Sequence, residues 1–145
     1  MIESIRRFNR YYARVLGVFN NKYLEVDYTP AQVRIIGEIG RNPGITAKEI
    51  ADFLSLDKSY LSREIRKLSG NGLIRRERSD SDGREMPMFL TDAGMKLHAE
   101  LDVRANRRIE KQIQALTDAE RSELVQAMEK IRRILPLENP DGIQN

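Results

Sequence analysis

The chain of 145 residues is 40% hydrophobic and 32% charged, with 25 Lys and Arg against 22 Asp and Glu. This length predicts one domain that buries a core without disulfides or a structural metal. The chain has no Cys and a single His, His98, which excludes disulfides, thiol sensing, multi-histidine metal centres and most imidazole catalysis. Because no apolar run approaches the length of a membrane span or a signal peptide, we expect a cytoplasmic non-enzyme without catalytic residues, metal or cofactor.

Positive charge is concentrated in two regions. Residues 1–14 and residues 57–84 each carry a net charge of +3, whereas the rest of the chain is slightly acidic. Clustered charge of one sign raises the local potential at which a polyanion can bind. The alternative interpretation is an ordinary solvated surface.

Helical periodicity and capping signals predict the first three helices. The first extends over about residues 2–22, with apolar residues at alternating steps of three and four along one face. Thr29, Pro30 and Gln32 then form a capping box with Pro at the first helical position, and this second helix ends at Gly40. Thr46 and Glu49 form another capping box, which opens a short third helix.

Residues 47–66, AKEIADFLSLDKSYLSREIR, have the pattern of a helix-turn-helix. A small residue, Ala51, stands where the two helices cross, and Leu54 and Leu56 surround the turn. Asp57 caps the following helix, whose inner face carries Leu61 and Ile65. Ser55 stands at the turn position that Gly often occupies. The pattern also occurs in proteins that do not bind DNA, so it needs support from the outward face.

The outward face of this fourth helix has the chemistry of a major-groove reader. Helical geometry places Ser59, Arg63 and Arg66 opposite the apolar stripe, and Tyr60, Ser62 and Lys67 beside them. Ser hydroxyls donate to or accept from most base edges, and Arg binds the two acceptors of guanine. The alternative is a solvated face with intrahelical pairs such as Glu64–Lys67 or Glu64–Lys58.

The next stretch, LIRRERSDSDGREMPMFLT, predicts a β-hairpin. Met86, Met88 and Leu90 alternate as in a half-buried strand, and Pro87 within it favours an edge strand. Arg78 leads into the loop, and Arg84 near its tip suits the negative potential of a narrow minor groove. We expect Asp82 to orient Arg84 or an Arg of the fourth helix through an ion pair. The alternative is an ordinary charged turn.

Two long helices close the chain. One begins at Thr91 or Asp92, and a third capping box, Thr117 with Glu120, opens the last. The apolar stripes of the first and the last two helices exceed what a compact helix-turn-helix and hairpin can cover, which predicts a dimer. A two-fold dimer on double-stranded DNA would read a pseudo-palindrome with half-sites about 10–10.5 base pairs apart.

The stretches TPAQVRIIGEI, TAKEIADFLSLDKSYLSREIRKLSGNGLIRR and DSDGREMPMFLTDAG, in this order, resemble the MarR family of winged-helix transcriptional regulators. The N-terminal helix and SYLSR are similar to the DNA-binding half of MarR–acetyltransferase fusions. The resemblance implies a mainly α fold with a small β-hairpin wing and a single domain over residues 1–145. It places the winged helix-turn-helix at about residues 29–90, dimerisation helices at about 2–22 and 92–135, and a tail at 136–145.

The resemblance also implies a homodimeric, ligand-responsive repressor that binds a small aromatic effector. Tyr11, Tyr12, Phe19 and Arg34 are the candidate pocket residues, although aromatic residues on such helices usually belong to a core or an interface. We expect His98 to be a surface or interface residue. The alternative function is a winged-helix interaction or regulatory module of a larger, acetyltransferase-like protein, without DNA readout of its own.

Overall fold

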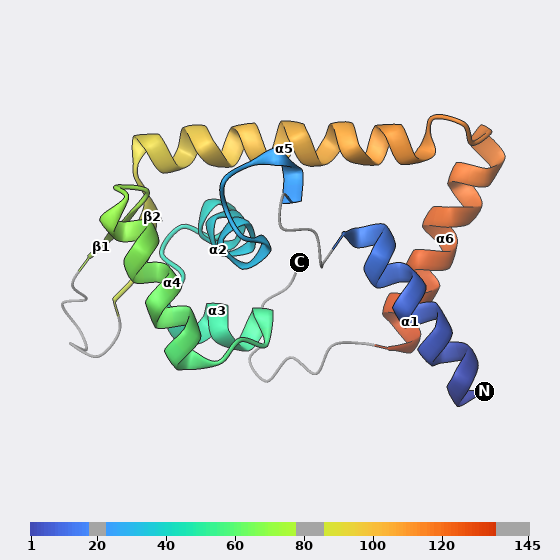
Figure 1. Ribbon diagram of the computed structural model, residues 1–145, viewed down its shortest axis with the longest axis horizontal. Coiled ribbons are helices and arrows are strands. Elements are labelled where there is room, and N and C mark those ends of the chain that lie inside the picture. The colour runs from blue at the N-terminus through green and yellow to red at the C-terminus, as the bar shows by residue number, and fades with distance from the viewer. Residues whose placement is uncertain (18–22, 78–85, 136–145) are drawn as a thin grey trace. The chain divides into compact units, whose positions relative to one another are not determined.

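The computed structural model describes residues 1–17, 23–77 and 86–135. These residues form two compact units, Met1–Leu101 and Asp102–Asn145, which are described separately. The elements in chain order (Figure 1) are α1 (Ile2–Leu16), the 3-10 turn η1 (Tyr23–Glu25), α2 (Pro30–Arg41), α3 (Ala47–Leu54), α4 (Lys58–Gly70), β1 (Ile74–Arg76), β2 (Met88–Leu90), α5 (Asp92–Ile113) and α6 (Asp118–Ile134).

The core of the first unit lies among α2, α3, α4 and the two strands. Helix α4 packs against α2, α3 and β1, and α2 packs against β2. The largest fully buried side chains come from α2, α3, α4 and β2 and are almost entirely Ile or Leu: Ile35, Ile36, Ile39, Ile50, Leu61, Ile65, Leu68 and Met88. Burial of this apolar surface is the main source of the unit's stability.

All three predicted capping boxes are present. The hydroxyls of Thr29, Thr46 and Thr117 each accept from the backbone N–H three residues later, and the side chain at that position accepts from the backbone of the capping Thr. Each pair satisfies two N–H groups that have no partner within the helix. The starts of α2, α3 and α6 are therefore fixed by local sequence.

Helix α1 is shorter than predicted. It ends at Leu16, because Gly17 adopts the left-handed conformation at φ 68° and its N–H donates to the carbonyls of Ala13 and Arg14. A glycine reaches this conformation without a steric penalty, which makes it a common helix stop. Residues 18–22 of the predicted helix lie outside the described residues.

The two strands form an antiparallel hairpin in which Ile74 pairs with Leu90 and Arg76 with Met88. The prediction that the second strand includes Met86 and Pro87 is wrong. Met86 is 41% exposed, and Pro87 precedes β2, where its carbonyl accepts from the N–H of Glu77. Proline has no N–H to donate to a strand ladder, so regular pairing begins at Met88.

Helix α5 begins where the prediction placed it. The Thr91 hydroxyl accepts from the N–H of Gly94 at 3.1 Å and donates to the carbonyl of Gly72 at 2.6 Å. A Cβ on Gly94 would lie 2.1 Å from the carbonyl oxygen of Leu73, so the first turn of α5 approaches the entry to β1 only because residue 94 has no side chain.

The second unit holds the end of α5 and the whole of α6. The Arg121 guanidinium closes the corner between them by donating to the carbonyl of Ile113 at 3.3 Å. No helix in the described ranges is both long and apolar enough to cross a membrane.

Candidate nucleic-acid interface

Helices α3 and α4 form the predicted helix-turn-helix. Ser55 ends α3 in the left-handed conformation, at φ 51° and ψ 44°, and the N–H of Leu56 donates to the carbonyl of Ala51 at 3.0 Å. The Asp57 carboxylate then accepts from the N–H of Tyr60 at 2.9 Å and caps α4. A serine therefore occupies the strained turn position for which glycine is the usual residue.

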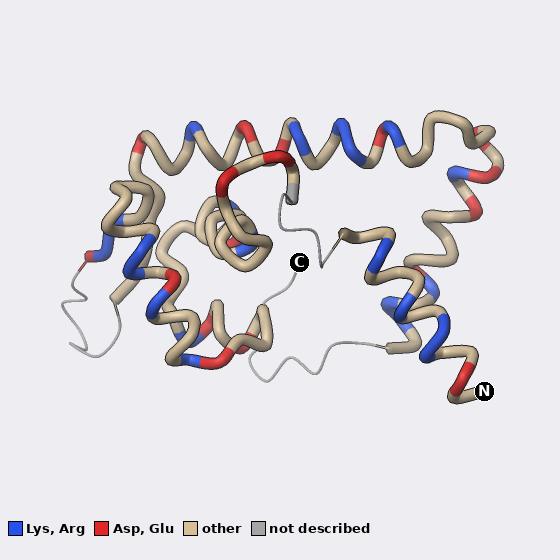
Figure 2. The backbone as a smooth tube through the Cα atoms, viewed as in Figure 1, with Lys and Arg blue, Asp and Glu red and all other residues tan. Residues whose placement is uncertain are grey.

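The two faces of α4 differ as the spacing predicted. Leu61, Ile65 and Leu68 are fully buried against the unit. The opposite side exposes Ser59, Ser62, Arg63, Arg66 and Lys67, with Tyr60 half-buried at its edge. Figure 2 shows the basic residues distributed along this helix. The six candidate residues of α4 thus share one solvent-facing surface, which we call the α4 outer face.

Arg63 is partly ordered by its own helix. Its guanidinium carbon lies 6.0 Å from the centre of the Tyr60 ring, at the outer limit of a cation–π contact. Because Tyr60 lies three residues before Arg63 on α4, this contact favours a guanidinium that lies along the α4 outer face and close to it.

Spacing alone did not reveal the role of Glu64. This carboxylate is buried, and it accepts from the Gln32 amide at 2.8 Å and from the Lys67 ammonium at 2.8 Å. The Glu64–Lys67 pair considered in the alternative interpretation is therefore present, while Lys67 remains on the exposed side. A second buried carboxylate, Glu38, pairs with Arg41 at 2.6 Å and supports the end of α2.

The hairpin beside α4 carries further cations. Arg75 lies 4.5 Å from the centre of the Phe89 ring and is paired with Glu77, and Arg76 is exposed. The candidate residues Arg78, Asp82 and Arg84 lie outside the described residues. The expected ion pair of Asp82 and the minor-groove role of Arg84 therefore stay predictions.

Comparisons with known proteins relate this helix-turn-helix and hairpin to a protein family. The profile described as "MarR family" matches residues 26–85, which include the whole helix-turn-helix. An uncharacterized HTH-type transcriptional regulator of Bacillus subtilis, YybA, is 24% identical over 83% of this chain and 81% of its own length. A mutant of MarR from E. coli has a TM-score of 0.74 at 25% identity, with coverage of 90% of this chain and 95% of the other.

Residues 26–85 of the chain, which hold its helix-turn-helix, belong to the MarR family of transcriptional regulators. FabT of Streptococcus pneumoniae, solved in complex with DNA, shares the fold with a TM-score of 0.75 at 20% identity, over 90% of this chain and 96% of that one. The predicted mainly α fold with a small hairpin is confirmed. Nothing in these matches supports the alternative of a module from an acetyltransferase fusion.

Three of the four predicted effector residues are among the described residues and lie on α1 and α2. Tyr12 stacks on Phe8 with ring centres 5.6 Å apart, Tyr11 and Arg34 are exposed, and Phe19 lies outside the described residues. The Phe8–Tyr12 stack fits the alternative of a core or interface equally well. The assignment of these residues to a ligand pocket stays a prediction.

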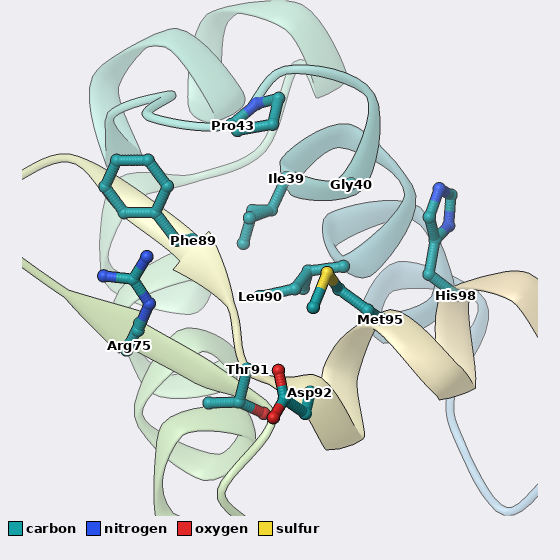
Figure 3. A pocket seen from close by; sticks show the side chains of 10 residues that line it. All are labelled: Ile39, Gly40, Pro43, Arg75, Phe89, Leu90, Thr91, Asp92, Met95 and His98. Carbon is teal, nitrogen blue, oxygen red and sulfur yellow. The ribbon is translucent and has the colours of Figure 1, made fainter.

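A different cavity, of about 630 Å³, lies between the end of α2, the hairpin and the start of α5. Figure 3 shows Arg75 and Phe89 at one end, His98 at the other, and Ile39, Leu90 and Met95 between them. His98 packs directly on Gly40, where an added Cβ would lie 2.4 Å from the ring. Tyr11, Tyr12 and Arg34 do not line this cavity.

Proposed function

We propose that this MarR-family regulator binds double-stranded DNA in a sequence-specific manner as a homodimer in the cytoplasm. In this proposal, α4 enters the major groove and the hairpin loop extends toward the neighbouring minor groove. The observation that carries it is the α4 outer face, on which Ser59, Ser62, Arg63 and Arg66 are exposed while the opposite face is buried. An amphipathic helix of this kind fits the width of the major groove.

The comparison with FabT supports the proposal. That protein was solved in complex with DNA, and its likeness to this chain shows that the two share a fold. The base-reading chemistry is argued from the side chains of this chain itself. Hydroxyls in the first turns with Arg in the next turn allow contacts both to base edges and to phosphates.

Exposed apolar surface supports the homodimer. Large hydrophobic side chains remain exposed on α1, on the end of α5 and along α6, and they include Ile5, Phe8, Val103, Ile109, Val125, Met128, Ile131 and Ile134. A set of this size is typical of an interface between chains. We propose that a second copy of the chain covers these side chains, because most soluble oligomers are closed and two-fold.

The proposal includes regulation by a ligand. The family resemblance supports a repressor that a small aromatic effector releases from DNA. The candidate effector residues Tyr11, Tyr12, Phe19 and Arg34 belong to this part of the proposal, which is separate from DNA binding itself.

The test is the affinity of the full chain for a random-sequence pool of duplex DNA, measured by fluorescence anisotropy at salt concentrations from about 50 to 200 mM. Each phosphate contact contributes about −0.9 to the slope of log affinity against log salt concentration. We expect a steep negative slope that corresponds to several contacts. No binding at the lowest salt concentration would overturn the proposed function.

A further inference from the structure

Glu64 is an unusual residue for a DNA-reading helix. It is the one acidic residue in the sequence of α4, Lys58–Gly70, and its side chain is only 6% exposed. A buried carboxylate is costly unless it is paired and hydrogen-bonded. Here both oxygens are bound, one by Gln32 and the other by Lys67.

The first partner of Glu64 connects α4 to the start of α2. The oxygen of the Gln32 amide accepts from the backbone N–H of Thr29 at 3.1 Å, and its nitrogen donates to Glu64 at 2.8 Å. A Glu at position 32 could also close the capping box, but it would place a second carboxylate against Glu64. The amide is the side chain that serves both neighbours.

The second partner is a cation of the α4 outer face. The Lys67 ammonium lies 2.8 Å from Glu64, and its side chain is 63% exposed. Lys67 lies at the flank of the helix, between the buried stripe and the direction of Arg63 and Arg66. The carboxylate therefore holds this ammonium toward the protein and compensates its charge locally.

We infer that Glu64 is a positioning residue that keeps Lys67 from the DNA phosphates and fixes α4 against α2. This inference rests on the proposed function and deepens it. In it, Arg63 and Arg66 supply the cationic contacts of α4, while Lys67 and Glu64 form a neutral pair at its edge. The Glu64–Lys67 pair weakens the electrostatic attraction of α4 to DNA of any sequence. The contacts of the other residues of the α4 outer face then determine which sequences are bound.

The main test is the variant Glu64→Gln in the full chain, with the same random-sequence duplex pool and salt series. A Gln at this position keeps one acceptor for Gln32 but has no charge with which to hold Lys67. One released Lys that contacts a phosphate steepens the slope of log affinity against log salt by about 0.9, an extra loss of about 3.5-fold between 50 and 200 mM. The double variant Glu64→Gln with Lys67→Gln returns the slope to the wild-type value.

Glu49→Gln is the matched control, because the Glu49 carboxylate accepts from the N–H and the hydroxyl of Thr46 in its own capping box and forms no salt bridge with a cation among the described residues. Its slope is expected to equal that of the wild type. A folded Glu64→Gln protein with the wild-type slope would overturn the inference, as would a double variant as steep as Glu64→Gln alone.

Lys67→Gln on the wild-type background covers the case in which Glu64→Gln does not fold. Affinity then falls, since Glu64 is left as an uncompensated anion near the DNA, but the slope keeps its wild-type value because no phosphate contact is lost. A slope shallower by about 0.9 would show that Lys67 contacts a phosphate, and it would end the inference. If the wild-type chain binds no DNA, the proposed function itself fails, and the two failures are distinguished in this way.

Discussion

Arg63 and Lys67 lie about one turn apart on α4, but their surroundings differ. Arg63 lies over the Tyr60 ring, whereas Lys67 is paired with a buried carboxylate. Helical spacing predicts the direction of both side chains, and both are exposed as expected. Spacing also offered the Glu64–Lys67 pair as an alternative, but it could not predict that Glu64 is buried and bonded to Gln32, which is 32 residues away in the sequence.

Two substitutions separate base reading from backbone contact. Arg63→Ala is expected to relax base specificity at a cost of about 1–3 kcal/mol, since a bidentate contact to a base edge would be lost. Arg84→Ala is expected to weaken binding to all sequences more uniformly. Footprinting titrations on a selected binding site and on unrelated DNA would measure both effects.

Lys130→Ala is the control for this pair, because Lys130 is an exposed cation on α6. Its affinity for both DNAs should match that of the wild type. If Arg63→Ala and Arg84→Ala also keep wild-type affinity for the selected site, the proposed interface is wrong.

The starts of the helices were predicted accurately, whereas strand limits and one helix end were not. Capping boxes such as that of Thr46 and Glu49 involve residues three apart, so the sequence contains the whole interaction. The extent of β2 depends instead on pairing with β1 across the hairpin, and Met86 fits the alternation without taking part in it. The end of α1 depends on the conformation that Gly17 adopts.

The start of α6 gives a prediction about pH. The backbone N–H of Thr117, and then its hydroxyl, bind the Glu120 carboxylate and hold the pKa of that group below its ordinary value. Because the pKa of Glu120 is lower in the folded chain than in the unfolded chain, its ionised carboxylate stabilises the start of α6 at any pH above the unfolded-state pKa. This stabilisation is lost as the pH falls through the pKa of Glu120 in the folded chain. The first turn of α6 should therefore fray in acid.

An NMR titration of the Glu120 side chain measures this effect. Thr117→Ala removes the hydroxyl and is expected to raise the pKa of Glu120 toward its ordinary value, while Thr117→Ser keeps the hydroxyl and the low pKa. If Glu120 titrates identically in Thr117→Ala and in the wild type, the Thr117 hydroxyl does not contribute to the lowered pKa.

At the scale of the whole molecule, the first unit has a fully buried core, but α6 has no buried residue at all. The apolar side chains of α6 gather on one face, as the sequence predicted for a dimerisation helix. A second chain would cover this surface and would also supply a second α4. The predicted homodimer would therefore bury the exposed apolar side chains of α6 and would also present two copies of α4 to a DNA site with two-fold symmetry.

Met128→Glu places a charge in the centre of the apolar stripe of α6, where the single chain leaves Met128 39% exposed. The individual chain tolerates this change, but an apolar interface does not, so sedimentation equilibrium should show a shift from dimer toward monomer. Gln126→Glu, on the opposite face of α6, is the matched control and should remain dimeric. A wild-type chain that sediments as a monomer would contradict the proposed dimer.

The most direct measurement for the central proposal is the selection of bound fragments from a random pool of double-stranded DNA by the full chain. We expect an enriched inverted repeat whose half-sites are centred about 10–10.5 base pairs apart, one for each α4 of a two-fold dimer. Fragments that share no motif, or a motif without two-fold symmetry, would contradict it.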